Sequence, residues 1–246
     1  AEKIAEGFAA SFTLGVGQFC TKPGLVFAVA GPELDVFLAA ASERVKKISP
    51  GTMLHRGICD TFAAGSAVME KLSGVRVLAR AEAGANAQRT EGAAVLMVVE
   101  AETFLREPKL AHEVFGPFAL VVRANSVTEL EILAQQLEGQ LTAALHTTDV
   151  DAEIAGRLLP VLTRKAGRVI FNGFPTGVEV SPAMQHGGPY PASTDSRFTA
   201  VGTAALLRWA RPVCFQNTPA ALLPEALRDG NPLGILRMVE GKPAIH

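Results

Sequence analysis

The chain has 246 residues, of which 48% are hydrophobic and 19% are charged, a composition that indicates a globular protein and excludes a disordered chain. Lysine and arginine together number 23 against 24 aspartates and glutamates, so the formal net charge is -1 and there is no basic surplus to attract nucleic acid. The longest apolar runs, such as residues 93–99, are far shorter than the ~20 residues that cross a bilayer. We therefore expect no nucleic-acid partner and no membrane association.

Three cysteines, Cys20, Cys59 and Cys214, show neither a CxxC pair nor the spacing of metal ligands. Their odd number argues against a disulfide framework, so we expect a reducing, cytoplasmic setting and no metal site. The first residues contain no initiator Met and open inside a helix-like pattern. We therefore expect the chain to be a fragment of a longer protein.

Apolar periodicity predicts alternating helices and strands along the first 172 residues. The first helix is indicated by Ile4, Phe8 and Phe12 at a spacing of four, and a later one by the capping box of Ser126 and Glu129. In chain order we expect helix 2–14, strand 25–30, helix 32–47, helix 56–72, strands 75–81, 93–99 and 118–122, helix 126–137, strand 141–145, helix 151–165 and strand 168–172. This alternation predicts an α/β fold with a largely parallel sheet flanked by helices.

The composition changes after residue 172. Residues 173–196 are rich in Gly, Pro and Ser, and an irregular segment of this length in a compact domain is usually functional. Five prolines follow Arg211, which favours an extended C-terminal segment over a core element. We expect a catalytic domain over residues 1–210 and an extended, oligomerising segment over residues 211–246.

Residues 15–24 read GVGQFCTKPG and place Cys20 between glycines that allow a tight turn and close approach of a ligand. A lone cysteine usually behaves as a small buried apolar side chain. Here Thr21 and Lys22 follow with polar and positive groups, and a nearby cation favours the reactive thiolate. We interpret Cys20 as a nucleophile.

Four segments resemble the aldehyde dehydrogenase superfamily. Residues 17–21 (GQFCT) are similar to its nucleophile segment and residues 113–117 (EVFGP) to its Glu-x-Phe-Gly-Pro segment, in the same order and with a fitting separation. The resemblance continues through residues 171–173 and 185–191, and so covers nearly the whole chain. The last of these segments, with those that follow it, is most similar to the 2-oxoglutarate semialdehyde (2,5-dioxopentanoate) dehydrogenase branch, and a related branch oxidises long-chain fatty aldehydes.

The resemblance implies roles for residues whose type alone does not settle them. It implies that Cys20 forms a thiohemiacetal and then a thioester, that Glu113 binds the ribose of NAD or NADP, and that Phe115 contacts the nicotinamide. His186 is followed by two glycines and carries an imidazole, a group that ordinarily titrates near neutral pH, and it is expected to act with Cys20. Without the resemblance, Glu113 reads as a solvated acid, Phe115 as a core aromatic and His186 as a hydrogen-bonding loop residue.

The sequence contains no GxGxxG fingerprint, and no phosphate-cradling loop precedes Cys20. The superfamily places its cofactor-binding domain and water-activating glutamate before the cysteine, so we expect these 246 residues alone to be inactive as a dehydrogenase. We also expect a homo-oligomer formed with the C-terminal region, and a small-molecule aldehyde as substrate. Three alternatives stay open: a fatty-aldehyde dehydrogenase, a thiol hydrolase or acyltransferase using Cys20 and His186, and a non-catalytic oligomerisation fragment with a merely buried Cys20.

Overall fold

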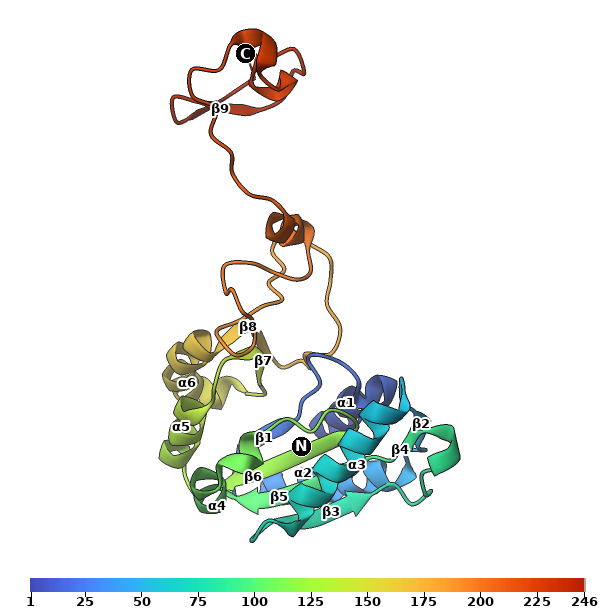
Figure 1. The fold of residues 1–246 in the computed structure, drawn as a ribbon. Helices are drawn as coiled ribbons and strands as arrows, with labels where there is room; N and C mark the ends of the chain where they lie inside the picture. The colour runs from blue at the N-terminus through green and yellow to red at the C-terminus, as the bar shows by residue number, and fades with distance from the viewer. Residues whose placement is uncertain (246) are drawn as a thin grey trace. The chain divides into compact units, whose positions relative to one another are not determined.

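The computed structural model describes residues 1–245 and divides into two compact units, Ala1–Arg208 and Trp209–His246 (Figure 1). In the first unit the elements are α1 (Glu2–Thr13), β1 (Leu25–Val29), α2 (Pro32–Lys47), β2 (Gly51–Thr52), α3 (Arg56–Lys71), β3 (Arg76–Arg80), β4 (Glu91–Gly92), β5 (Val95–Glu100), α4 (Ala101–Arg106), β6 (Phe118–Ala124), α5 (Val127–Gln136), β7 (Gln140–Leu145), α6 (Ala152–Lys165) and β8 (Ala166–Phe171). Each helix and strand expected from the sequence is confirmed, with ends that differ by a few residues.

The main sheet has four strands in the order β1-β6-β5-β3. Strands β1, β6 and β5 are parallel, whereas β3 runs antiparallel to β5. The connection from β3 to β5 contains only a single 3-10 turn and the short β4. Two parallel neighbouring strands normally need a longer crossover, such as a helix, so this short connection favours an antiparallel pair. The sheet is thus largely parallel, as predicted, with one antiparallel edge.

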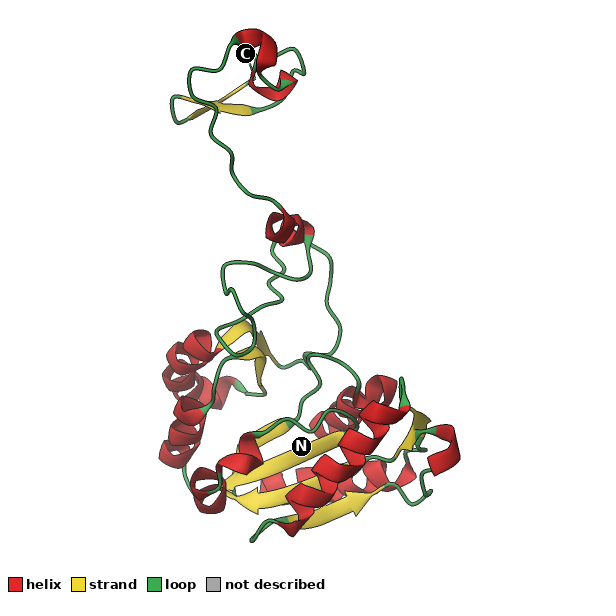
Figure 2. Cartoon of the chain, viewed as in Figure 1, coloured by secondary structure: helices red, strands yellow, loops and turns green. Residues whose placement is uncertain are grey.

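Helices cover both faces of the main sheet (Figure 2). Successive side chains of a strand point to opposite faces, and β5 shows this directly. Its Leu96 and Val98 pack with α1 and α2, while Met97 and Val99 pack with α3 and α4. All four side chains are almost fully buried, so β5 and its neighbour β6 form the centre of the core.

Strands β7 and β8 form a separate two-stranded parallel sheet. The crossover between them is α6, which packs against α5 and buries Leu158, Val161 and Leu162. The chain leaves β8 into an irregular segment, since residues 172–202 contain no helix or strand. This agrees with the irregular segment predicted from the sequence over residues 173–196.

The second unit contains short turns and one hairpin. Its 3-10 turns cover Ala220–Leu222 and Glu225–Leu227, and the antiparallel pair is formed by β9 (Arg237–Val239) and β10 (Lys242–Ala244). The proline content predicted an extended segment but did not reveal the hairpin. None of the helices formed by residues 1–245 is both long enough and apolar enough to span a membrane.

We predict that Leu120→Ala lowers the free energy of unfolding by about 2–5 kcal/mol, because Leu120 is fully buried in β6 and truncation leaves a cavity. Val150→Ala is the control, since Val150 is 89% exposed and should change the same quantity by less than about 0.5 kcal/mol. Urea unfolding of both variants measures the difference, and equal effects would contradict the central position of β6.

Candidate active site

The turn before Cys20 is left-handed. Gly15, Val16 and Gly17 have φ values of 56°, 59° and 66°. Glycine adopts this conformation readily, whereas a residue with a Cβ does so at a cost of about 1–2 kcal/mol. Val16 is held there by packing, because its Cγ2 lies 2.5 Å from the position that a Cβ on Gly51 would occupy. The strained valine therefore locks the turn against β2.

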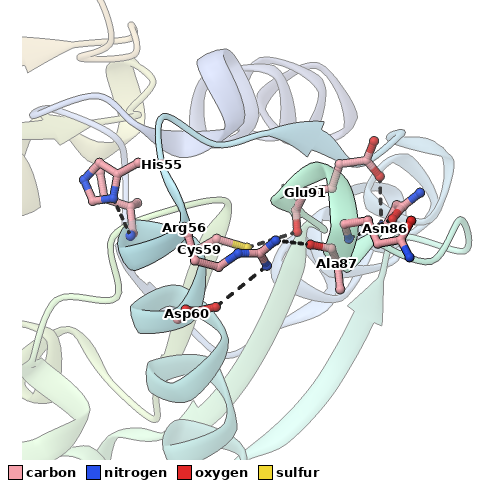
Figure 3. A network of polar contacts seen from close by, with 9 residues as sticks. His55, Arg56, Cys59, Asp60, Asn86, Ala87 and Glu91 are labelled. Carbon is pink, nitrogen blue, oxygen red and sulfur yellow. Dashed lines mark hydrogen bonds and ion pairs between the residues drawn. The ribbon is translucent and has the colours of Figure 1, made fainter.

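A polar network holds β4, the strand that pairs with β2, next to the start of α3 (Figure 3). The Asn86 N–H donates to Glu91 Oε2 at 2.9 Å, and the Arg56 guanidinium donates to the Ala87 carbonyl. The buried Cys59 thiol donates to the Glu91 carbonyl, with 3.5 Å between sulfur and oxygen. These contacts tie the first turns of α3 to β4, so Cys59 has a structural position and supports β4.

Gln18 fastens the same loop by its side chain. Its Oε1 accepts from the Leu54 N–H at 2.9 Å, and its Nε2 donates to the Gly15 carbonyl at 3.0 Å. One amide thus joins the segment after β2 to the left-handed turn. The position of Cys20, two residues later, follows from these contacts.

The loop also lies directly against residues 113–117. Gly17 is buried, and a Cβ on it would overlap the Gly116 carbonyl and the Pro117 nitrogen. Only glycine allows this backbone-to-backbone approach. The structure therefore brings together the two segments, GQFCT and EVFGP, that the sequence separates by more than ninety residues.

Cys20 and His186 form a close pair. Cys20 is exposed, and its Sγ lies 3.2 Å from Nε2 of His186. His186 is 8% exposed and is anchored by its backbone, since its N–H donates to Thr199 Oγ1 at 2.7 Å and its carbonyl accepts from the Ala200 N–H at 2.8 Å. The irregular segment after β8 thus presents a buried imidazole to a solvent-accessible thiol.

Burial lowers the pKa of His186, and the positive charge of Arg168 lowers this pKa further. The imidazole is therefore neutral at neutral pH. Its Nδ1 is buried and has no hydrogen-bond partner among residues 1–245, while Nε2 faces the thiol. In the tautomer with its proton on Nδ1, Nε2 can accept the thiol proton.

Arg168 is a site residue that the sequence interpretation missed. It lies on β8, donates to the Pro175 carbonyl at 2.7 Å, and interacts electrostatically with Cys20. Burial lowers its pKa, and the Cys20 charge opposes this shift. Thr21 Oγ1 donates to the same Pro175 oxygen at 2.9 Å. An arginine within the otherwise apolar run AGRVIF was the available signal.

Lys22 does not serve as the cation expected beside the thiol. Its Nζ donates to the Phe118 carbonyl at 2.7 Å and to the Val114 carbonyl at 3.2 Å. Burial lowers the pKa of Lys22 to about 8, and the charge of Glu113 opposes this shift. The ammonium of Lys22 is thus engaged by backbone carbonyls, and Arg168 is a cation that interacts electrostatically with Cys20.

The structure exposes the carboxylate of Glu113 and leaves Phe115 half-buried. Val114, which stands between them, is buried in the core, so Glu113 and Phe115 are attached to a residue whose position is fixed by packing. An exposed carboxylate can accept hydrogen bonds from ribose hydroxyls, and a partly exposed aromatic ring can pack on a planar group. These two residues therefore fit a nicotinamide cofactor, and their role stays a prediction.

Two further loop residues have structural partners. Asn172 adopts φ 52° and its Oδ1 accepts from the Thr147 N–H at 2.8 Å, so it fixes backbone geometry. Arg197 forms an ion pair with Asp195 at 2.6 Å and lowers the pKa of that carboxyl to about 2. Within residues 1–245 no group of three His, Cys, Asp or Glu side chains is arranged to hold a metal ion.

The profile of the aldehyde dehydrogenase family matches residues 1–203. The chain belongs to this family. It is 49% identical over 241 residues to alpha-ketoglutaric semialdehyde dehydrogenase 2 of Azospirillum brasilense, covering 98% of this chain and 46% of that protein. It is 44% identical over 240 residues to alpha-ketoglutaric semialdehyde dehydrogenase of Acinetobacter baylyi, covering 98% and 45%. The chain thus spans about half the length of these curated relatives.

The fold is also that of aldehyde dehydrogenases. The NAD+ complex structure of aldehyde dehydrogenase from Bacillus cereus superposes with a TM-score of 0.64 over 83% of this chain and 40% of that one. The sequence identity is 17%, so this likeness concerns the fold. It agrees with the α/β architecture and the mainly parallel sheet of the present family member.

We predict that Gly17→Ala separates the nucleophile loop from residues 113–117, because the new Cβ would overlap the Gly116 carbonyl and φ 66° disfavours any side chain. The free energy of unfolding should fall by about 1–3 kcal/mol. The rate at which Cys20 is alkylated should differ from that of wild type, because the loop that carries the thiol has moved. Gly84→Ala is the matched control, since nothing lies within 4 Å of the position that a Cβ on Gly84 would occupy. Equal behaviour of the two variants in urea unfolding would contradict the close approach.

We predict that wild type gains stability relative to Lys22→Met as the pH rises from about 8 to 10.5. In this window the unfolded chain keeps the Lys22 proton while the native chain has lost it, so the unfolded state binds more protons and the free energy of unfolding rises with pH. The gain should stay below about 3 kcal/mol. Urea unfolding at several pH values measures it, and a difference independent of pH would show that Lys22 titrates normally.

Proposed function

We propose that these residues are the catalytic portion of an NAD(P)-dependent aldehyde dehydrogenase that oxidises 2-oxoglutarate semialdehyde to 2-oxoglutarate. The observation that carries the proposal is the exposed Cys20 Sγ at 3.2 Å from Nε2 of the buried, neutral His186. The substrate is supported by the names of the two curated relatives, both alpha-ketoglutaric semialdehyde dehydrogenases.

In the first half of the reaction, His186 Nε2 accepts the thiol proton and the Cys20 sulfur adds to the aldehyde carbon. The carbonyl double bond opens, and its oxygen becomes an alkoxide that backbone N–H groups of the Cys20 loop can stabilise. Burial keeps the imidazole neutral before this step by lowering its pKa, and the charge of Arg168 lowers this pKa further. The product of the step is a thiohemiacetal on Cys20.

In the second half, the alkoxide reforms its double bond while the carbon–hydrogen bond breaks. A nicotinamide held by Glu113 and Phe115 would accept the departing hydride, and the oxidised carbon would then remain as a thioester on Cys20. Water then adds to the thioester carbon, the carbon–sulfur bond breaks, and the carboxylic acid leaves. The thiolate that remains takes back one proton and restores Cys20.

Glu113 and Phe115 are proposed to hold the cofactor, the carboxylate at the ribose and the ring at the nicotinamide. The Bacillus cereus enzyme of the same fold is described as an NAD+ complex, which supports a nicotinamide cofactor. The proposal covers NAD and NADP alike. It also includes a homo-oligomer and a cytoplasmic location. These 246 residues alone are proposed to lack dehydrogenase activity, since the relatives are about twice as long.

Acyl transfer without a nicotinamide is the second candidate function. The same thiol and imidazole suffice for it, because a thioester can also form by displacement of the leaving group of an activated ester. A chain that forms a thioester from such an ester, but never from aldehyde plus NAD(P), would favour this function.

The test compares Cys20→Ser and His186→Asn with wild type. Turnover is measured with these 246 residues joined to the part of the relatives that this chain does not cover, and NAD(P) reduction is followed with 2-oxoglutarate semialdehyde. We predict that Cys20→Ser abolishes reduction and that His186→Asn slows it by on the order of 10²-fold, the contribution typical of a positioned proton acceptor.

Iodoacetamide labelling of the 246-residue chain provides the matched control. Cys20 should react well ahead of the buried Cys59, and Cys59→Ser should leave the labelling of Cys20 unchanged. Cys214 is also exposed and has no histidine partner in the described structure, so its rate gives the reference for an unactivated thiol. Equal rates at Cys20 and Cys214 in wild type, with full turnover in His186→Asn, would refute the proposed pair.

A further inference from the structure

The proposed reaction leaves one charged side chain of the site without a task. Lys22 follows the nucleophile by two residues, and its Nζ reaches across to the segment that holds Glu113 and Phe115. It donates to the Val114 carbonyl at 3.2 Å and to the Phe118 carbonyl at 2.7 Å. A Cβ built on Gly24 would lie only 3.2 Å from the same nitrogen. The ammonium is thus enclosed by backbone on several sides.

The Phe118 bond lies at the start of a strand ladder. The pairing of β1 with β6 begins with Leu25 opposite Leu120, and the Leu120 N–H donates to the Gly24 carbonyl at 2.9 Å. Pro23, just before Gly24, has no N–H to offer to β6. Lys22 supplies a donor at this end of the ladder, where it joins the nucleophile loop to the first residue of β6.

The Val114 bond acts on the two proposed cofactor residues. Val114 stands between Glu113 and Phe115, its side chain is 5% exposed, and its Cγ1 lies 3.5 Å from the Cβ position of Gly65 on α3. The core therefore holds the side chain while Lys22 holds the carbonyl. Because the peptide unit is planar, holding Val114 by both its side chain and its carbonyl also restricts the directions in which the side chains of Glu113 and Phe115 point.

A lysine is a demanding choice for this task. An ammonium removed from water loses solvation, and burial accordingly lowers the pKa of Lys22 to about 8. The nearby Glu113 charge opposes that shift. The charge couples Lys22 to the carboxylate that we assign to the ribose, and a neutral donor at this position would lack that coupling.

We propose that Lys22 is a positioning residue that sets the direction of Glu113 and Phe115 relative to Cys20, and so determines cofactor affinity. The inference rests on the proposed function, because it takes Glu113 and Phe115 as the cofactor residues. Lys22 itself touches neither the substrate nor the reacting sulfur in this arrangement. Its effect is transmitted by the Val114 and Phe118 carbonyls.

The experiment measures kcat and KM for NAD(P) of Lys22→Met in the complete enzyme used for turnover above. We expect KM for NAD(P) to rise about tenfold and kcat to fall less than about threefold, because the nucleophile stays in place while cofactor orientation is lost. Lys22→Arg keeps the charge and donors and should recover at least about half of the affinity. Lys109→Met is the matched control, since Lys109 is exposed and lies four residues before Glu113.

A second readout separates positioning from general damage. Iodoacetamide labelling of Cys20 without cofactor should keep its rate in Lys22→Met within about twofold of wild type, whereas protection of Cys20 by added NAD(P) should need more cofactor. If Lys22→Met folds poorly by circular dichroism, Lys22→Leu replaces it, because leucine likewise offers the Val114 and Phe118 carbonyls neither a donor nor a charge. A slower labelling rate together with an unchanged KM would overturn the inference.

Glu113→Gln distinguishes failure of the inference from failure of the proposed function. If Glu113→Gln raises KM for NAD(P) and the Lys22 variants do not, Lys22 has no positioning role and the cofactor assignment stands. If neither residue affects KM, the cofactor assignment is wrong and the inference falls with it. A rise in KM for both, with Lys109→Met unchanged, supports the inference.

Discussion

The backbone contact between Gly17 and Gly116 is the constraint on which the candidate site depends. Residues 15–24 precede β1 and residues 113–117 precede β6, and these two strands pair in parallel. Their preceding loops must therefore emerge at the same edge of the sheet. The absence of a side chain at Gly17 lets the loops touch, so that the segment carrying the thiol lies against the segment carrying the proposed cofactor residues.

The fold was largely predictable from the sequence because its signals are local. The spacing of Phe8 and Phe12, and the capping box at Ser126, each describe one element and were sufficient to place it. The direction of β3 was not predictable in this way, since strand direction depends on the connection to β5. The six-residue α4 was missed because a single helical turn and a half leaves too little periodicity to recognise.

The candidate site was predictable only in part. Cys20 and His186 are 166 residues apart, and only the resemblance to a known family linked them before their 3.2 Å separation was seen. Residue type alone assigned Lys22 to the thiol, yet its ammonium lies among backbone carbonyls. Arg168 escaped notice for the same physical reason: where a long cationic side chain ends is decided by tertiary packing, which no local pattern records.

The Pro175 carbonyl connects the two sides of the catalytic pair. It accepts hydrogen bonds from Thr21, next to the nucleophile, and from Arg168, on the strand from which the histidine segment departs. A single carbonyl oxygen thereby joins the loop that carries the thiol to β8. The loop that carries the thiol and the strand that precedes the histidine segment are therefore joined at a main-chain atom as well as by the contact between Cys20 and His186.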